Sequence, residues 1–215
     1  MKFDTYLFDF DGTLVDSMPT YVSAMLRILD ENHIQYGDDI VKIITPLGLG
    51  GAADYFATLG ITEPKPQLLQ RMKAYMLDGY MYHIPAKSNV IPVLQQLKAN
   101  GASLNVLTAS PHDTLDPCLK RLGIFDIFDN VWSCEDFATT KADPNIYVMA
   151  AEKLGKTVNE VLFLDDNLNA DKTAKQAGMP VCGVYDASSK DYTEEIKAAT
   201  DYYIYDFTEL PALRF

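Results

Sequence analysis

The sequence has little cysteine, one tryptophan and no long apolar run. Its three cysteines, Cys118, Cys134 and Cys182, are odd in number and widely spaced, which favours neither a disulfide framework nor a zinc site. No stretch approaches the roughly 20 apolar residues that a membrane-spanning helix needs. The N-terminal residues turn acidic at Asp4 and do not resemble a signal peptide. We therefore expect a cytoplasmic protein with reduced thiols and no membrane partner.

Positive charge is also scarce. The chain has 18 Lys and Arg residues against 30 Asp and Glu, a net charge of −12, which opposes binding to a phosphate backbone and makes nucleic acid an unexpected partner. With 48% hydrophobic and 22% charged residues, the composition is that of a folded globule rather than a disordered chain. A length of 215 residues exceeds the usual single domain of about 150, so we expect one core with an added lobe. We also expect a monomer or weak dimer.

Short apolar runs alternate with helical patterns along the whole chain, which is typical of βαβ units. Candidate strands lie at residues 6–8, 104–107, 131–132, 161–164, 181–184 and 202–204. Their continuous apolar character fits a parallel sheet that is buried on both faces. The predicted fold class is therefore α/β, with an open parallel Rossmann-like sheet as its core.

A long insert without a clear strand separates the first two candidate strands. Residues 16–84 are too many for an ordinary connection and predict an all-helical lobe, while 1–15 and 85–215 form the α/β core. The first helix of the lobe has Asp16 or Ser17 as its N-cap and Pro19 in its first turn, and it ends near Gly37. A glycine-rich loop at residues 46–51 leads to a second helix, and residues 67–80 predict another.

Polar residues follow three of the candidate strands where each one ends. In parallel sheets these carboxyl ends meet at one edge, where ligands bind. The residues concerned are Asp9 and Asp11 after the first strand, Thr108 and Ala109 after the second, and Asp165 and Asp166 after the run at 161–164. Lys141 lies in a polar stretch between two strands and can reach the same edge.

Each of these residues has an ordinary structural interpretation when taken alone. Strand-end aspartates often form helix caps or turns, and an isolated lysine such as Lys141 is commonly a solvated surface residue. The pair Asp9 and Asp11 fits this interpretation poorly, because two carboxylates at the mouth of a buried strand repel each other. A cation with oxygen ligands, such as Mg²⁺, removes that repulsion, and the sequence has no Cys/His cluster that favours zinc.

Four motifs in chain order carry a resemblance to a known family. Residues 8–17, FDFDGTLVDS, resemble the opening motif of the phosphatase branch of the haloacid dehalogenase (HAD) superfamily. Residues 106–108 (VLT), 141–147 (KADPNIY) and 163–166 (FLDD), the last followed by Ala177 and Gly178, are similar to the second, third and fourth motifs. The insert at 16–84 is similar to the helical cap of the phosphoglycolate phosphatase and β-phosphoglucomutase group.

The resemblance implies a Mg²⁺-dependent phosphatase that hydrolyses a small-metabolite phosphomonoester. It implies that Asp9 is the nucleophile that forms an aspartyl-phosphate and that Asp11 is the general acid and base. It also implies that Mg²⁺ is held by the Asp9 carboxylate, the Asp11 backbone carbonyl and Asp166, with Asp165 acting behind them or through water. The implied phosphate-binding groups are Thr108, the Ala109 amide and Lys141, and the implied substrate loop is Leu47, Gly48 and Leu49.

Some positions depart from the family pattern. Ala109 stands where many relatives have Asn, and Ala170 stands where many have a further aspartate. Asp171 lies one position later, on another face of its helix, so we leave it out of the metal site. His112 is isolated in the sequence and we interpret it as a surface or helix-end residue.

Two alternatives remain open at this point. A phosphosugar mutase of the β-phosphoglucomutase type usually has a histidine in the first cap helix, where this chain has Tyr21, and the stretch 41–59 has no arginine. A non-catalytic phosphate-binding module, such as a signalling receiver, also combines acidic residues with a Thr and a Lys. In a receiver the acidic residues come in a different order and no lid of this size is present.

Overall fold

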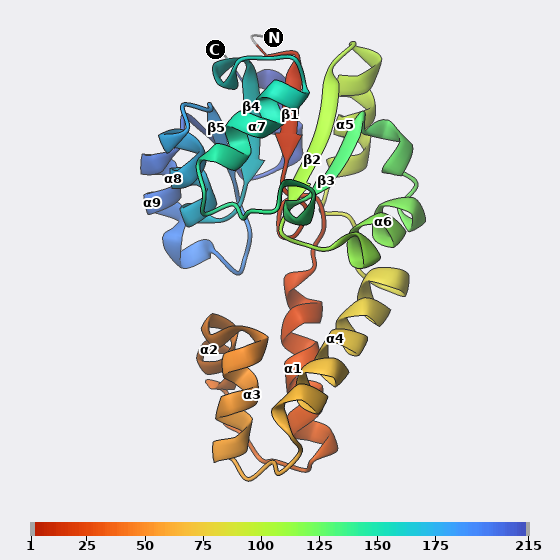
Figure 1. Cartoon of the computed structure of the whole chain (residues 1–215), viewed down its shortest axis with the longest axis vertical. Coiled ribbons are helices and arrows are strands. Elements are labelled where there is room, and N and C mark those ends of the chain that lie inside the picture. The colour runs from red at the N-terminus through yellow and green to blue at the C-terminus, as the bar shows by residue number, and fades with distance from the viewer. Residues whose placement is uncertain (1–2, 214–215) are drawn as a thin grey trace. The chain divides into compact units, whose positions relative to one another are not determined.

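The computed structural model describes residues 3–213, and its strands form one parallel sheet in the order β3-β2-β1-β4-β5-β6 (Figure 1). The strands are β1 (Thr5–Phe8), β2 (Ser103–Thr108), β3 (Asn130–Ser133), β4 (Val161–Asp165), β5 (Val181–Val184) and β6 (Tyr202–Ile204). Each coincides with a predicted apolar run, extended at its ends by at most two residues. The predicted α/β fold with an open parallel sheet is confirmed.

The register of the sheet brings the ends of three strands to the same level. β1 lies between β2 and β4, and Phe8 is paired with Val106 on one side and with Leu164 on the other. The Asp9 amide continues this ladder by donating to the Leu164 carbonyl at 2.8 Å. The residues that follow β1, β2 and β4 therefore emerge side by side at the carboxyl edge of the sheet.

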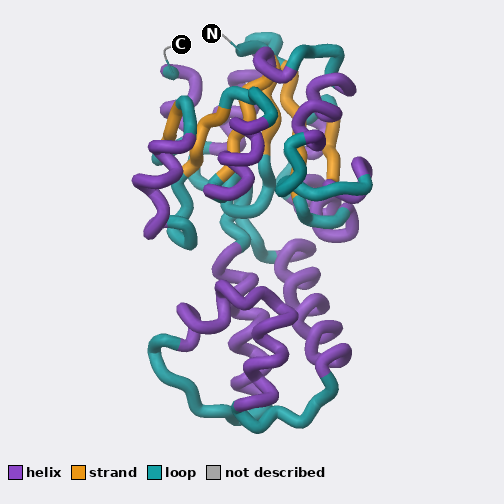
Figure 2. The backbone as a smooth tube through the Cα atoms, turned by 60° about the vertical axis from the view of Figure 1, so that its left-hand side comes forward, coloured by secondary structure: helices purple, strands orange, loops and turns teal. Residues whose placement is uncertain are grey.

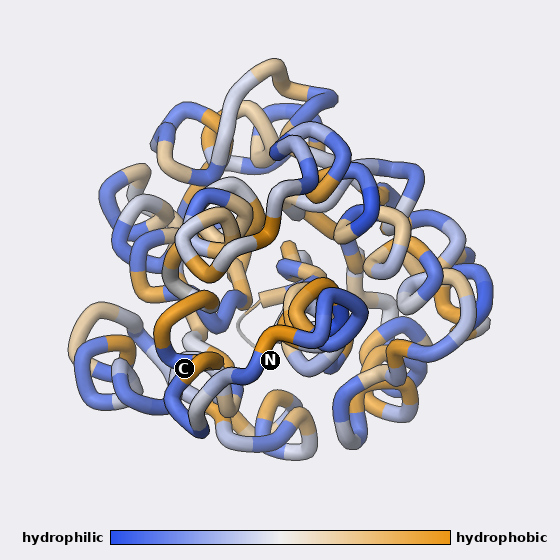
Figure 3. The backbone as a smooth tube through the Cα atoms, turned by 90° about the horizontal axis from the view of Figure 1, so that it is seen from below, coloured by the Kyte–Doolittle hydropathy of each residue, from blue (hydrophilic) through white to orange (hydrophobic). Residues whose placement is uncertain are grey.

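Helices and apolar side chains cover both faces of the sheet. The helices of this part are α5 (Val90–Ala99), α6 (His112–Arg121), α7 (Asn145–Lys153), α8 (Leu168–Gln176) and α9 (Thr193–Ala199). Side chains of α7 and α8 pack with Leu7, Leu107 and Phe163 on one face. On the other face Phe8 stacks against Phe207 of η6 (Phe207–Ala212) at a centroid distance of 6.3 Å. Figure 3 shows hydrophobic and hydrophilic residues alternating along the helices, as burial of one helix side requires.

The chain divides into two compact units, one made of Met1–Asp16 with Pro85–Phe215 and the other of Ser17–Ile84. We call them the core and the cap. Within the described residues every strand lies in the core, and the cap consists of helices and loops (Figure 2). The cap helices are α1 (Met18–Glu31), α2 (Ile40–Ile44), α3 (Gly48–Thr58) and α4 (Lys65–Tyr82). Across residues 3–213 no helix has both the length and the apolarity needed to span a membrane.

Both ends of α1 differ from their prediction. Ser17 occupies the N-cap position with helical angles (φ −91°, ψ −20°), so its hydroxyl caps no amide and is buried without a hydrogen-bond partner among the described residues. The helix ends at Glu31 rather than near Gly37. His33 takes a left-handed conformation (φ 55°), and the Ile34 amide donates to the Leu29 carbonyl at 3.0 Å, which closes the helix without a glycine.

The glycine-rich stretch is helical rather than a connecting loop. The short helix α2 was not predicted at all, and it leads through η1 (Thr45–Leu47) into α3, which begins at Gly48. Gly50 and Gly51 therefore lie in the first turn of α3, despite the low helix propensity of glycine. Ala52, Ala53 and Phe56 are buried in the cap interior, and this packing outweighs the local preference.

Gly79 permits close packing of α1 against α4. A Cβ at this position would lie 2.3 Å from Cγ2 of Thr20, a β-branched side chain with restricted rotation. We predict that Gly79→Ala lowers the unfolding free energy, measured by urea denaturation, by about 1–3 kcal/mol through overpacking. Gly50→Ala is the matched control, because nothing lies within 4 Å of the added methyl and alanine favours the helix. It should raise stability by up to about 1 kcal/mol, and equal effects of the two variants would contradict the packing argument.

Candidate active site

Three buried carboxylates converge at the carboxyl edge of the sheet. Asp9 follows β1, Asp165 ends β4 and Asp166 comes next, and one oxygen from each lies within 4.8 Å of the others. All three residues are buried. We call this set the acidic cluster. It arises because β1 and β4 are neighbours in register, so residues 156 positions apart meet at one point.

Lys141 supplies the positive charge at the cluster. Its Nζ donates to Asp9 Oδ1 at 2.6 Å and to Asp165 Oδ2 at 2.7 Å. The lysine reaches this point from the loop that precedes α7. Tyr147 of α7 lies beneath that loop, with its Oη 3.2 Å from the Lys141 carbonyl and 3.2 Å from the Ala170 carbonyl. The Tyr147 hydroxyl, with one hydrogen to donate, therefore lies between the Lys141 backbone and α8, and the Lys141 ammonium sits between two strand ends.

Burial and mutual repulsion dominate the electrostatics of the cluster. Burial raises the pKa of Asp9 to about 7, against the opposing effect of the Lys141 charge. Burial, and then the charges of Asp165 and Asp9, raise the pKa of Asp166 well above its usual range. Although burial acts to lower it, the carboxylates of Asp165 and Asp9 hold the pKa of Lys141 well above normal. One ammonium does not compensate three carboxylates, so the cluster retains a demand for further positive charge.

The donor set of the cluster fits a hard divalent cation. Each of the three side chains offers a carboxylate oxygen, and oxygen ligands are those that Mg²⁺ prefers. A bound cation would offset the repulsion that otherwise favours protonation of Asp9 and Asp166. The described residues place no histidine or cysteine in this ligand group, in keeping with an oxygen-liganded metal rather than zinc.

The turn after Asp9 is packed directly against Asp166. Gly12 has a positive φ of 76°, and a Cβ there would lie 2.5 Å from Asp166 Oδ2, so the position requires glycine. Thr13 is buried and its Oγ1 donates to Asp166 Oδ1 at 3.1 Å. The turn from Asp11 to Thr13 is thereby fixed to the end of β4.

Asp11 is held by the loop that follows β2. Ser110 Oγ donates to Asp11 Oδ2 at 2.5 Å, and the Ser110 amide donates to Thr108 Oγ1 at 3.1 Å. Because the Thr108 oxygen accepts from Ser110, its own hydroxyl hydrogen is directed elsewhere and can be donated to a ligand. Ala109 is exposed between these two residues. The predicted neighbours Asp11, Thr108 and Ala109 therefore belong to one polar loop system.

Other residues singled out in the sequence lie in the cap or in α8. Leu47, Gly48 and Leu49 lie in the cap, where η1 meets α3, with Leu47 46% exposed. Asp171 is fully buried in α8, and its oxygens have no hydrogen-bond partner among the described residues. Burial, and then the charges of Asp165 and Asp166, raise its pKa to about 9. It is not one of the three carboxylates that meet at the cluster.

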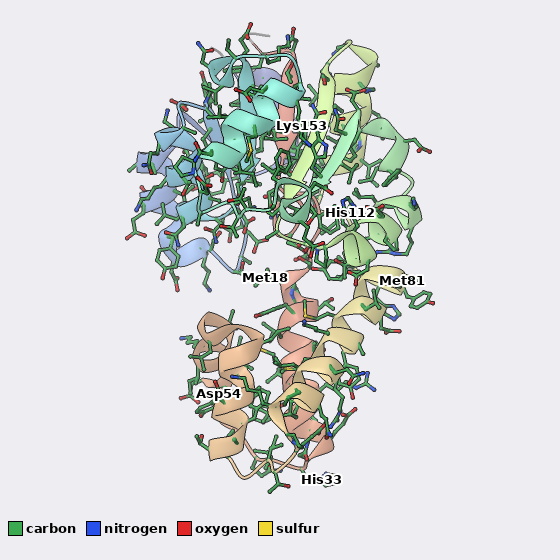
Figure 4. All side chains as sticks on the ribbon, viewed as in Figure 1. Met18, His33, Asp54, Met81, His112 and Lys153 are labelled. Atoms are coloured by element: carbon green, nitrogen blue, oxygen red, sulfur yellow. The ribbon has the colours of Figure 1, made fainter. Side chains whose placement is uncertain are left out.

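His112, labelled in Figure 4, forms a bridge between two elements of the core. It begins α6, and its Nδ1 lies 2.8 Å from Asp116 of the same helix. Its Nε2 lies 2.9 Å from Asp136 of η3 (Cys134–Phe137), the segment after β3. His112 lies at the end of a helix, as predicted, but the sequence offered no indication of its second carboxylate partner.

Sequence reasoning assigned no role to Ser110, Thr13 or Lys87. Thr13 stands inside the first motif and Ser110 comes two positions after the second, so their proximity to polar strand ends was the available signal. Lys87 donates from Nζ to the Gly12 carbonyl at 2.5 Å and to the Tyr185 carbonyl at 2.6 Å, and it also pairs with Asp186. No motif marks this lysine, because its three partners come from two distant segments.

The chain belongs to the haloacid dehalogenase-like hydrolase family, whose model matches residues 3–178. It is thus an enzyme of the hydrolase class. It is 30% identical to phosphoglycolate phosphatase of Salmonella typhi, over 96% of this chain and 90% of the relative. The solved structure of a candidate beta-phosphoglucomutase from Thermotoga maritima matches with a TM-score of 0.82 and 21% identity, over 96% of each chain. The magnesium-bound candidate HAD hydrolase YfnB of Bacillus subtilis matches with a TM-score of 0.82 and 18% identity, over 99% and 98% of the two chains.

The His112 bridge predicts a pH-dependent contribution to stability. Hydrogen bonds with Asp116 and then Asp136 raise the pKa of His112, so the folded state binds its proton more tightly than the unfolded state. The stabilisation is complete below the ordinary histidine pKa of about 6.5 and is lost as pH rises through the raised value. We predict that the Tm advantage of the wild type over His112→Gln is larger at pH 6 than at pH 9. A difference that is the same at both pH values would contradict the ionic bridge.

Proposed function

We propose that this protein is a Mg²⁺-dependent phosphatase that hydrolyses a small-metabolite phosphomonoester through a phosphoaspartate at Asp9. The observation that carries the proposal is the acidic cluster with Lys141 bonded to both Asp9 and Asp165. A buried site with this excess of negative charge is suited to a cation and, through that cation, to an anionic substrate. Membership of a hydrolase family with phosphatases among its relatives supports the same reaction.

The chemical roles follow from the positions of two aspartates. Asp9 projects from the end of the central strand β1 and serves as the nucleophile that attacks phosphorus. Asp11, two residues on, protonates the leaving oxygen and then accepts a proton from the water that hydrolyses the intermediate. The Ser110 hydroxyl holds the Asp11 carboxyl for both proton transfers. Water attack at phosphorus releases inorganic phosphate and returns Asp9 as a carboxylate.

Three groups of the core stabilise the charge on the phosphoryl oxygens. An ammonium has three hydrogens, and Lys141 gives two of them to Asp9 and Asp165, so a third can be donated to the substrate. The hydroxyl of Thr108 donates a second hydrogen bond to the phosphoryl oxygens. Its hydrogen is available because the bond with Ser110 uses only its oxygen, as an acceptor. The amide of Ala109, an exposed residue, would supply a third donor. Such preorganised donors lower the barrier to phosphoryl transfer.

Mg²⁺ would be held by the carboxylates of Asp9 and Asp166 and by the backbone carbonyl of Asp11. When bound, it supplies charge neutralisation and polarises a phosphoryl oxygen. Asp165 supports the site by orienting Lys141 and by accepting from the Asn167 amide at 2.8 Å. The magnesium bound to the similar B. subtilis structure agrees with this choice of ion.

The cap would select the substrate, with Leu47, Gly48 and Leu49 as the proposed contact loop. Tyr21 is bonded to the backbone of Leu49, and burial raises its pKa. A phenol whose pKa is raised stays protonated near neutral pH and is a poorer proton-transfer group there than histidine, so we favour hydrolysis over mutase activity. Interconversion of sugar 1- and 6-phosphates without phosphate release would instead favour mutase activity over hydrolysis. We also propose that the enzyme acts in the cytoplasm as a monomer or weak dimer.

Replacement of the nucleophile tests the proposal most simply. We predict that the wild type releases phosphate from members of a phosphorylated-metabolite panel with Mg²⁺ but not with EDTA. Asp9→Asn should reduce release to the background of the assay, because an amide cannot form the phosphoaspartate. Asp4→Asn is the matched control, since it makes the same change at an exposed position of the core and should retain activity. Full turnover by Asp9→Asn would contradict the assignment.

Ser110 is predicted to act through Asp11 rather than through substrate. Ser110→Ala removes the hydroxyl that orients the Asp11 carboxyl, so kcat should fall by about tenfold with little change in KM. Ser103→Ala, at the opposite end of β2, is the control and should leave both constants unchanged. A raised KM with an unchanged kcat would mean that Ser110 binds the substrate instead. Steady-state kinetics on the best substrate of the panel distinguish the two results.

A further inference from the structure

Lys87 carries a partly buried ammonium that the proposed reaction does not use. Its side chain is 17% exposed, and its Nζ donates to the Gly12 carbonyl at 2.5 Å, the Tyr185 carbonyl at 2.6 Å and Asp186 Oδ2 at 2.9 Å. Three hydrogens meet three acceptors, so the ammonium is saturated. In this it differs from Lys141, which has two such partners. Lys87 has no hydrogen left for a substrate phosphate, so any effect on catalysis must pass through the groups that it holds.

The most significant of these groups is the Gly12 carbonyl. Glycine is the residue with the greatest backbone freedom, and Gly12 separates Asp11, the proposed acid and base, from Thr13, which bonds to Asp166. The same glycine leaves no room for a Cβ against the Asp166 carboxylate. An anchor on its carbonyl therefore fixes the peptides on both sides, including the one that carries the Asp11 carbonyl.

The surroundings of Lys87 make this anchor rigid. Its own amide donates to the Leu14 carbonyl at 3.0 Å, and the Asp16 amide donates to the Pro85 carbonyl at 3.0 Å. The other end of the contact is equally fixed, because Asp186 Oδ1 accepts from the amide and the hydroxyl of Ser188. Lys87 thus joins the turn after β1 to the segment after β5.

We propose that Lys87 is a positioning residue that locks the Asp11–Gly12 turn against Asp166 and thereby sets the affinity of the acidic cluster for Mg²⁺. The inference rests on the metal site of the proposed function. It goes further by assigning control of that site to a lysine outside every recognised motif. Outer groups that orient metal ligands commonly change metal affinity by about 10–100-fold.

Geometry and charge predict opposite results for Lys87→Met. Loss of the anchor should weaken Mg²⁺ binding, whereas loss of a positive charge near carboxylates should strengthen it. For Asp186→Asn the two causes also predict different results, and here the charge effect is the one that weakens binding. The ammonium keeps both carbonyl acceptors, so positioning predicts affinity close to wild type, while removal of a negative charge predicts weaker binding. The two variants together separate the two causes.

The experiment measures the rise in Tm with Mg²⁺ concentration, without substrate. We expect Lys87→Met to raise the Mg²⁺ concentration for half-maximal stabilisation by about tenfold and Asp186→Asn to leave it near wild type. Lys98→Met is the matched control, since Lys98 pairs with Asp129 at an exposed site of the core and should bind Mg²⁺ as the wild type does. A lower Tm for Lys87→Met with unchanged or tighter Mg²⁺ binding would overturn the inference.

Lys87→Arg provides the test if Lys87→Met does not fold. The arginine keeps the charge but cannot place one nitrogen on three acceptors. Positioning therefore predicts weaker Mg²⁺ binding, whereas a pure charge effect predicts Mg²⁺ binding equal to that of the wild type. Absence of a Mg²⁺ effect on the wild type would overturn the metal site and this inference together. Failure of the proposed hydrolysis appears separately, as absence of phosphate release by a wild type that still binds Mg²⁺.

Discussion

Repulsion among Asp9, Asp165 and Asp166 is the constraint on which the rest of the site depends. Burial removes the water that would otherwise screen the three carboxylates, and Lys141 compensates only part of their charge. An acidic cluster of this kind opposes folding unless positive charge is present. Much of the surrounding structure serves to place such charge or to keep the carboxylates in position. The burial of these carboxylates therefore serves the chemistry of the site rather than the stability of the fold.

The fold meets this constraint with rigid elements. Parallel pairing of β1 with β4 brings the aspartates together, and the turn at Gly12 packs against Asp166 because it lacks a Cβ. Tyr147 supports the loop of Lys141 from below, while Ser110 and Lys87 hold the turn that contains Asp11. Each of these contacts lies within the core. The cap has an apolar interior of its own.

The sheet and the convergence of the carboxylates could be predicted from the sequence because both follow from local patterns. Continuous apolar runs mark buried parallel strands, and the residue after each run falls at one edge. The cap was harder to predict. Its glycine-rich stretch is helical because Ala52, Ala53 and Phe56 are buried, a fact of packing that local propensity does not contain. The contacts of Ser110, Lys87 and His112 depend on segments that are distant in sequence, and no spacing rule identifies such partners.

The central claim is that Asp9 becomes phosphorylated during turnover, and one measurement addresses it directly. The Mg²⁺-loaded enzyme is mixed with its best phosphorylated substrate, quenched in acid within the first turnover and analysed by peptide mass spectrometry. We predict one phosphoryl group on the peptide that contains Asp9, removable by hydroxylamine, as expected of an acyl phosphate. Turnover with no such group on Asp9, or with the group on another residue, would contradict the account.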